Sequence, residues 1–215
     1  MNIVIFGTGG HAKVVADIVE KEGIHRIVGL VSQDGRPGNF IPGYEVIAGN
    51  SGFHKVIKKV RARGAIVALG NAAQRMELVK RIGGKLEFVT AIHPAAVIDK
   101  SVRIGAGTVV MAGVVINSST VTGRHCILNT SCSVDHDCRI GDYTHICPGC
   151  HIAGYVNIGR ECWIGIGSTI IDHLSVGDQA FVGAGSVVAK AVGRNMRVCG
   201  NPARKFKSSG DKKRD

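Results

Sequence analysis

The hydrophobic pattern changes its period near residue 90, and this change divides the chain into two halves. Before that point, aliphatic side chains form short runs that fit alternating strands and helices. From Ile92 to Val188 an aliphatic residue returns at every sixth position, and Thr122 is the single exception among seventeen positions. An α-helix repeats every 3.6 residues and a strand every second residue. The pattern therefore predicts a hexapeptide repeat that winds as a β-helix.

A second position, four residues after each aliphatic one, holds mainly small side chains. Five of the seven cysteines occupy it, namely Cys126, Cys132, Cys138, Cys150 and Cys162. A narrow coil needs slim residues inside, and free cysteine behaves there as a small hydrophobe. We therefore interpret these thiols as core residues and not as metal ligands or redox groups. Cys147 and Cys199 lie off this register and are expected to be ordinary thiols, since no Cys-x-x-Cys pair occupies that off-register face.

The first half of the chain predicts a small parallel α/β domain. Strands are expected at residues 2–6, 26–31 and 65–70, and helices at residues 11–23, 53–64 and 72–84. Residues 31–52 are rich in Gly and Pro and are interpreted as a loop region.

The turn after the first strand has the pattern Gly-x-Gly-x-x-Ala, with Gly7, Gly9, Gly10 and Ala12. Such a turn lets a phosphate approach the backbone N–H groups at the start of a helix. An NAD site would usually have an acidic residue at the end of the second strand, where this sequence has Ser32. The turn thus indicates a phosphate-containing ligand without identifying it.

Composition and charge narrow the classes of function. With 215 residues, 45% hydrophobic and 20% charged, the chain is typical of a soluble folded protein. The N-terminus has no basic segment before its short apolar run, so we expect a cytoplasmic protein with no membrane insertion. The net charge is +11, but aromatic content is only 5%, so we expect no nucleic-acid partner. Residues 208–215 are expected to form a disordered basic tail.

Four motifs in order resemble one family, the sugar acyltransferases of the sialic acid and bacillosamine pathways (NeuD/PglD-like). They are GTGGHAKVVADIVE, ALGNAAQRMEL, VDHDCRIGDYTHICPG and CGNPARKFK. The resemblance covers all but about the last eight residues. It implies an α/β Rossmann-like domain at residues 1–90 and an all-β, left-handed parallel β-helix at residues 91–207. The left hand is implied by the resemblance alone, because parallel crossovers are usually right-handed.

The resemblance also implies a reaction and an assembly. It predicts an acetyltransferase that uses acetyl-CoA as co-substrate and a nucleotide-linked amino sugar as acceptor, with active sites between the prisms of a homotrimer. His136 would be the general base and Asp137 its partner. Residues expected to contact acetyl-CoA are His145, Gly154, Ile166 and Ala184. Residues expected to contact the nucleotide sugar are Gly7, Gly9, Gly10, His11, Asp34, Gly70, Asn71, Arg75 and Asn129.

Several of these residues have other interpretations. His11 could cap the start of the first helix, Arg75 could be a solvated helix residue, and Asn129 could only stack or cap a turn. His136 should point outward from the prism, although Asp137 beside it would face the opposite way in a regular strand. His145 lies nine residues further on, half a coil away, so a neighbouring subunit would have to bring the two histidines together.

Other functions remain open at this stage. Zinc is considered because four histidines lie on the repeat, namely His136, His145, His151 and His173, but their spacing does not fit the known three-histidine sites and we expect no metal. The predicted activity is N-acetylation of a UDP-4-amino-sugar type acceptor for bacterial glycan synthesis. The alternatives are O-acetylation of sialic acid or a related sugar, and a non-catalytic β-helix that binds nucleotide sugars.

Overall fold

The N-terminal domain is a parallel sheet with helices on both faces. The computed structural model describes residues 1–33, 35 and 41–206. The elements in chain order are β1 (Asn2–Phe6), α1 (Gly10–Glu22), β2 (Arg26–Ser32), β3 (Val46–Gly49), α2 (Phe53–Lys59), β4 (Gly64–Val67), α3 (Ala72–Ile82) and β5 (Glu87–Phe88), with a short 3₁₀ turn at Gly83–Lys85. The strand order is β3-β2-β1-β4-β5, and every pair is parallel. The order reverses between β1 and β4, where open α/β sheets bind ligands at the carboxyl ends of their strands.

Two sequence predictions for this domain were wrong in detail. The region 31–52 was expected to be all loop, but it contains β3, which pairs with the edge of β2. The helix expected at 53–64 ends at Lys59, because Arg61 adopts a left-handed backbone conformation (φ 53°) and the chain then enters β4. Short segments of this kind depend on pairing with a neighbouring strand more than on their own pattern.

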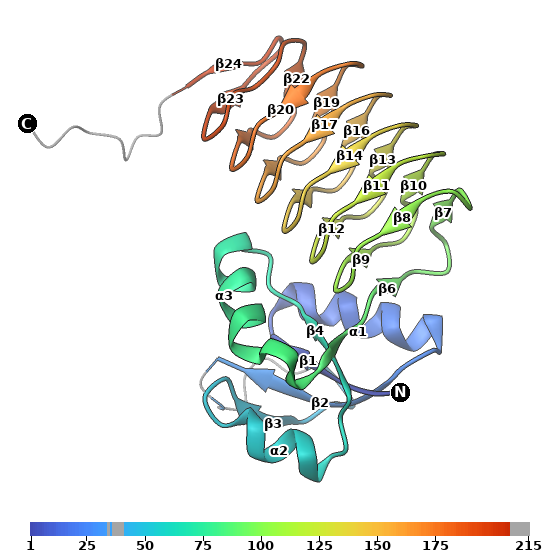
Figure 1. Ribbon diagram of the computed structural model, residues 1–215, viewed down its shortest axis with the longest axis vertical. Coiled ribbons are helices and arrows are strands. Elements are labelled where there is room, and N and C mark those ends of the chain that lie inside the picture. The colour runs from blue at the N-terminus through green and yellow to red at the C-terminus, as the bar shows by residue number, and fades with distance from the viewer. Residues whose placement is uncertain (34, 36–40, 207–215) are drawn as a thin grey trace, which may run out of the picture.

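The C-terminal part is a parallel β-helix whose strands have two residues each, except for the three-residue strand Arg197–Cys199 (Figure 1). Face 1 contains β6 (Ala91–Ile92), β9 (Val109–Val110), β12 (Ile127–Leu128), β15 (His145–Ile146), β18 (Trp163–Ile164), β21 (Phe181–Val182), β23 (Arg197–Cys199) and the antiparallel β24 (Arg204–Lys205). Face 2 contains β7 (Val97–Ile98), β10 (Val115–Ile116), β13 (Ser133–Val134), β16 (His151–Ile152), β19 (Thr169–Ile170) and β22 (Val187–Val188). Face 3 contains β8 (Arg103–Ile104), β11 (Val121–Thr122), β14 (Arg139–Ile140), β17 (Asn157–Ile158) and β20 (Ser175–Val176).

From β6 to β22 the paired residues of the β-helix are eighteen positions apart, as Val134 pairs with Ile116 and Ile152. The corners between faces turn through residues with positive φ, for example Asp137 (58°) and Tyr155 (59°). We call these corners 1–2, 2–3 and 3–1 after the faces that they join. The expected boundary at residue 90 falls between β5, which ends at Phe88, and β6, which begins at Ala91.

The interior of the prism confirms the interpretation of the cysteines. The five register thiols are at most 1% exposed, and all seven cysteines are free. Several of these thiols donate a hydrogen bond to a corner carbonyl fifteen residues ahead, as Cys138 Sγ does to the Ala153 oxygen at 3.1 Å. The hydroxyl of Thr120 makes the same kind of bond to the backbone oxygen of Asp135 at 2.7 Å. The inward position therefore selects side chains that are small and can also donate a hydrogen bond.

Figure 1 shows the N-terminal domain at one end of the β-helix. Helix α1 packs on the face of the sheet that continues into the core of the first coils, whereas α2 and α3 share the opposite face. Val109 and Ala91 of face 1 are buried and belong to the same hydrophobic cluster as Ile3 and Val15 of the N-terminal domain. The predicted limit at residue 207 and the predicted tail at 208–215 lie outside the described residues. Within the described ranges, no helix is both long enough and apolar enough to cross a bilayer.

Candidate active site

His136 and Asp137 form a hydrogen-bonded pair at corner 2–3, between β13 and β14. The Nδ1 atom of His136 lies 2.9 Å from Oδ2 of Asp137, and the two side chains are 45% and 39% exposed. Consecutive residues can meet in this way because Asp137 has a left-handed backbone conformation (φ 58°), which a regular strand does not allow. A carboxylate can only accept, so this hydrogen bond is donated by Nδ1–H and favours the tautomer in which Nε2 carries the lone pair of a base.

Gly154 lies directly against the ring of His136, one coil further along the β-helix. A Cβ atom at position 154 would lie only 2.8 Å from Cε1 and 2.9 Å from Nε2 of that ring. Tyr155 packs edge-on against the same ring, with centroids 5.2 Å apart. The N–H of Gly154 has no hydrogen-bond acceptor among the described residues. Any side chain at position 154 would displace the ring, and the free N–H is available to a ligand.

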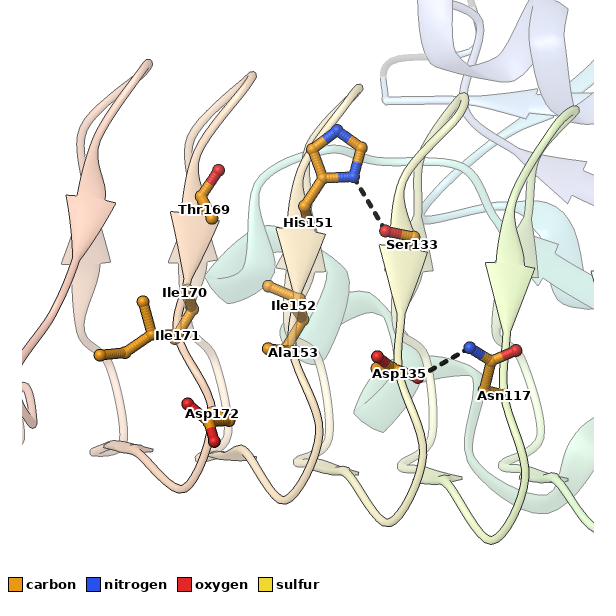
Figure 2. A pocket seen from close by; sticks show the side chains of 10 residues that line it. All are labelled: Asn117, Ser133, Asp135, His151, Ile152, Ala153, Thr169, Ile170, Ile171 and Asp172. Atoms are coloured by element: carbon orange, nitrogen blue, oxygen red, sulfur yellow. Dashed lines mark hydrogen bonds between the residues drawn. The ribbon is translucent and has the colours of Figure 1, made fainter.

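A hollow of about 460 Å³ runs along face 2, and Asp135, the residue before His136, is part of its lining (Figure 2). Asp135 accepts hydrogen bonds from Asn117 Nδ2 at 2.8 Å and from the His136 N–H at 2.9 Å. These two bonds, the one from Asn117 first, lower the pKa of the Asp135 carboxyl. Ser133 and His151 form a second pair across the hollow at 2.9 Å, as the dashed line in Figure 2 marks. The carboxylate of Asp135 thus places a fixed negative charge in the hollow, beside the His136–Asp137 pair.

His145 lies on face 1, beneath the N-terminal domain, and is only 7% exposed. Its Nε2 pairs with Asn129 Nδ2 at 3.0 Å, and its ring packs edge-on against Trp163 at 4.6 Å. Burial is the main reason why the pKa of His145 falls to about 3, and the neighbouring His11 and Arg75 lower it further. His145 is therefore neutral at physiological pH.

His11 comes from the start of α1 and interacts electrostatically with His145 across the domain boundary. Its Nε2 atom is buried without a hydrogen-bond partner among the described residues. Burial, helped by Arg75, lowers the pKa of His11 to about 4. The alternative that His11 caps the helix is wrong, because the N-cap is Gly9 and no side chain caps this end. The unpartnered nitrogen is available to a polar ligand between the domains.

Arg75 is 1% exposed, so the alternative of a solvated helix residue is wrong. Its guanidinium donates to backbone carbonyls of Leu69 and Gly70 in the N-terminal domain and of His125 and Tyr143 in the β-helix. Burial lowers the pKa of Arg75 to about 10. With four of its five N–H groups engaged by the protein, Arg75 has little left for the direct substrate contact that was predicted.

The glycine turn borders a hollow of about 360 Å³ at the carboxyl end of the N-terminal sheet. Gly7 has a φ of 135°, and a Cβ there would lie 2.6 Å from the Ala68 oxygen, so only glycine fits. Gly9 and Gly10 face open space instead, at the uncapped start of α1. A helix start with free N–H groups attracts phosphate. The hollow itself is lined by Gly7, Val31, Gln33, Asn50, Leu69, Gln74, Glu77, Leu78 and Arg81.

Gly70 and Asn71 form the turn between β4 and α3. Asn71 is the N-cap of α3, and its Oδ1 accepts from the Gln74 N–H at 3.0 Å. Both residues line a further hollow of about 560 Å³ that reaches Trp163 on face 1. Asn129 also makes a local turn contact, because its Oδ1 accepts from the Thr130 N–H at 2.8 Å.

Within one chain the predicted residues form two separate groups. His136, Asp137 and Gly154 lie at corner 2–3, whereas His11, Asn129 and His145 lie between face 1 and the N-terminal domain. Ile166, 56% exposed, and the exposed Ala184 lie at corner 1–2 between the two groups. Asp34 lies outside the described residues.

Sequence reasoning missed several residues around these groups, notably Asp135, Tyr155 and Trp163. The signal was present for two of them, because Tyr155 and Trp163 are bulky aromatics at outward positions of a repeat that otherwise has few. The register of the repeat also gave a signal for Asp135, because Asn117 stands eighteen residues before it and lies one coil away. Within the described ranges, no group of three or more His, Cys, Asp or Glu could hold a metal ion.

Comparison with known proteins gives these observations a context. Residues 2–82 match the family described as the PglD N-terminal domain, and residues 155–190 match the bacterial transferase hexapeptide family (six repeats). The structure of PerB from Caulobacter crescentus, in complex with CoA and GDP-perosamine, is 34% identical with a TM-score of 0.90, covering 96% of this chain and 98% of that one. The chain belongs to the PglD-like family of hexapeptide-repeat acetyltransferases.

Other members of the family agree with this assignment. The acetyltransferase domain of PglB from Neisseria gonorrhoeae FA1090, in complex with acetyl coenzyme A, is 32% identical with a TM-score of 0.85, covering 95% of this chain and 98% of that one. UDP-N-acetylbacillosamine N-acetyltransferase of Bacillus subtilis (strain 168) is 34% identical over 116 residues, 52% of this chain and 51% of that protein. The chain thus matches about half the length of this curated relative. The resemblance and the predicted fold class, including the left-handed β-helix, are confirmed.

Proposed function

We propose that the protein transfers the acetyl group of acetyl-CoA to the amino group of a nucleotide-linked amino sugar. The His136–Asp137 pair against Gly154 is the observation that supports this most directly. The chain also aligns over nearly its whole length with PerB, whose structure holds CoA and GDP-perosamine. The N-terminal hollow, with its uncapped helix start, supports binding of the nucleotide diphosphate.

The proposed reaction is a direct attack without an acyl-enzyme. The sugar nitrogen adds to the thioester carbonyl while Nε2 of His136 accepts a proton from it. Asp137 stabilises the resulting imidazolium through Nδ1. The N–H of Gly154 donates to the tetrahedral oxyanion. When the intermediate collapses, the carbon–sulfur bond breaks, the imidazolium returns its proton to the sulfur, and CoA leaves as a thiol beside the new amide.

A test of this role is the substitution His136→Ala, with His173→Ala as the matched control. The side chain of His173 is 69% exposed and lies at the same corner, one coil beyond Tyr155. We expect kcat of His136→Ala to fall by about 10² to 10⁴-fold, the usual contribution of a general base, with acetyl-CoA affinity nearly unchanged. The control should keep most of its turnover. A fully active His136→Ala variant would refute the assignment.

We also propose that the working unit is a homotrimer in which corner 2–3 of one subunit meets face 1 and corner 1–2 of the next. The separation of the two groups of residues within one chain supports this arrangement. Mixing and refolding the single variants His136→Ala and His145→Ala tests it. With random assortment, about a quarter of the interfaces would combine two intact groups and regain activity. If the complete site lay in one chain, the mixture would stay as inactive as its parts.

The identity of the nucleotide is a separate question. The name of the Bacillus subtilis relative contains a UDP-linked sugar, and the PerB structure holds a GDP-linked one. Calorimetric titration with UDP, GDP, CMP and free sialic acid separates the possibilities. Binding of free sialic acid alone would favour the O-acetylation alternative. Nucleotide binding without CoA release from acetyl-CoA in the presence of 4-amino sugars would favour a non-catalytic binding protein.

A further inference from the structure

Arg75 is a buried cation that is held only by backbone carbonyls. No carboxylate of the described residues forms an ion pair with it. Its Nη1 donates to Leu69 O at 2.7 Å and Gly70 O at 3.1 Å. Its Nε donates to His125 O at 2.9 Å and its Nη2 to Tyr143 O at 2.6 Å. One guanidinium thus joins a loop of the N-terminal domain to two successive coils of the β-helix.

The segments that Arg75 joins carry residues of the proposed site. Gly70 belongs to the loop that faces His145, and Tyr143 stands two residues before His145 in the same coil. His125 stands four residues before Asn129, which pairs with His145. The position of the nucleotide-sugar domain relative to face 1 is therefore fixed close to the place where both substrates would meet.

Aromatic packing supports the same junction. The ring of His125 stacks on Tyr143 with centroids 5.1 Å apart and an interplanar angle of 15°. Phe88 at the end of β5 packs edge-on against His125 at 4.7 Å. His125 is 4% exposed, so this contact is part of the buried interface between the domains. Arg75 supplies the hydrogen bonds of the junction and these rings supply its apolar contact.

The geometry requires arginine. The four carbonyl oxygens are reached by three different nitrogen atoms of a planar fork, whereas lysine offers all its protons from a single nitrogen. Lysine at this position would keep the charge and lose the simultaneous contact with both domains.

We propose that Arg75 is a positioning residue that holds the nucleotide-sugar domain in register with the acyl-transfer face. This inference rests on the proposed function. Its loss should reduce turnover without weakening the binding of either substrate, because the two binding surfaces remain but their relative placement changes. A misplacement of about 1 Å can cost about 10²-fold in rate.

The variants Arg75→Lys and Arg75→Ala test the proposal, with Arg63→Lys as the matched control on the exposed approach to β4. We expect kcat to fall by about 10²-fold in both Arg75 variants, with dissociation constants for nucleotide and CoA within about twofold of the parent. Millimolar guanidinium ion should restore part of the turnover of Arg75→Ala. A purely structural role would lower the melting temperature and the folded fraction and leave kcat per folded molecule intact, which would overturn the proposal. A parallel loss of nucleotide affinity would also overturn it, by making Arg75 a contact residue.

A second measurement does not depend on activity. Hydrogen–deuterium exchange at residues 69–71 and 143–145 should accelerate in Arg75→Lys and stay unchanged in Arg63→Lys. If Arg75→Ala does not fold, His125→Ala takes its place, because it removes the ring contact and leaves the guanidinium in the chain. Exchange in the same two segments should then be faster in His125→Ala. If wild type lacks transferase activity but these segments respond, the proposed function fails while the junction stands. If exchange is unchanged in Arg75→Lys, the junction itself is refuted.

Discussion

Gly154→Ala is the substitution that most sharply tests the geometry of the proposed base. Position 154 has no positive φ, so its backbone accepts alanine without strain. The new Cβ would lie 2.8 Å from Cε1 of His136, whereas ordinary van der Waals contact begins at 3.4 Å. To restore ordinary contact the ring must retreat by 0.6 Å, the difference between these distances. Such a shift weakens the 2.9 Å hydrogen bond to Asp137 as well.

The expected cost follows from that displacement. A 1 Å error in placing a reacting group costs about 10²-fold, so a shift of this size should lower kcat by about 10 to 10²-fold, or about 1.4 to 2.7 kcal/mol. Alanine keeps the backbone N–H, so this loss reports the position of His136 and not the loss of the oxyanion donor. The melting temperature should be unchanged or slightly raised, because alanine reduces the entropy of the unfolded chain.

Steady-state kinetics with acetyl-CoA and an amino-sugar nucleotide, combined with thermal unfolding, measure both quantities. Gly84→Ala is the matched control, since no atom lies within 4 Å of a Cβ at that exposed position. If Gly154→Ala keeps full turnover while His136→Ala loses it, the ring does not rest against Gly154 in the working enzyme, and the argument is refuted.

Three further predictions concern stability and reactivity. Thr122→Val should raise the free energy of unfolding by about 1 to 3 kcal/mol, because it removes a buried hydroxyl that has no partner among the described residues. Thr144→Val should lower the free energy of unfolding by a similar amount, because the Thr144 hydroxyl makes hydrogen bonds of 2.7 and 3.0 Å. Thermal unfolding that shifts in the same direction for both variants would contradict the structure. Titration of the native protein with a thiol reagent should modify at most Cys199, because the other six thiols are buried. All seven thiols should react once the protein is unfolded. Rapid reaction of more than one thiol in the native protein would be inconsistent with this core. Burial lowers the pKa of His125 to about 4 and of His145 to about 3, so each takes up a proton on unfolding below pH 6.5. Their contribution to stability is complete above pH 6.5 and is lost as the pH falls toward 4 and 3, and a melting temperature that stays constant over that range would count against these assignments.

The sequence by itself determined the β-helix and its core. A hexapeptide repeat is nearly one-dimensional, because each residue contacts its equivalents eighteen positions away, so the sequence register gives the spatial neighbours directly. For this reason the aliphatic stack and the buried cysteines could be assigned, and the outward position of His136 could be predicted from Val134. The short strand β3 could not, because its four residues depend on pairing with β2.

Only the tertiary structure decided which distant side chains meet. Asp137 reaches His136 because a corner residue adopts a left-handed conformation, which no pattern of side-chain polarity records. Arg75 was expected at a ligand or in solvent, yet it is buried between domains because carbonyls separated from it by 50 and 68 residues converge on its guanidinium. Repeats encode contacts within themselves, whereas contacts between the repeat and another domain depend on how the two folded surfaces fit together.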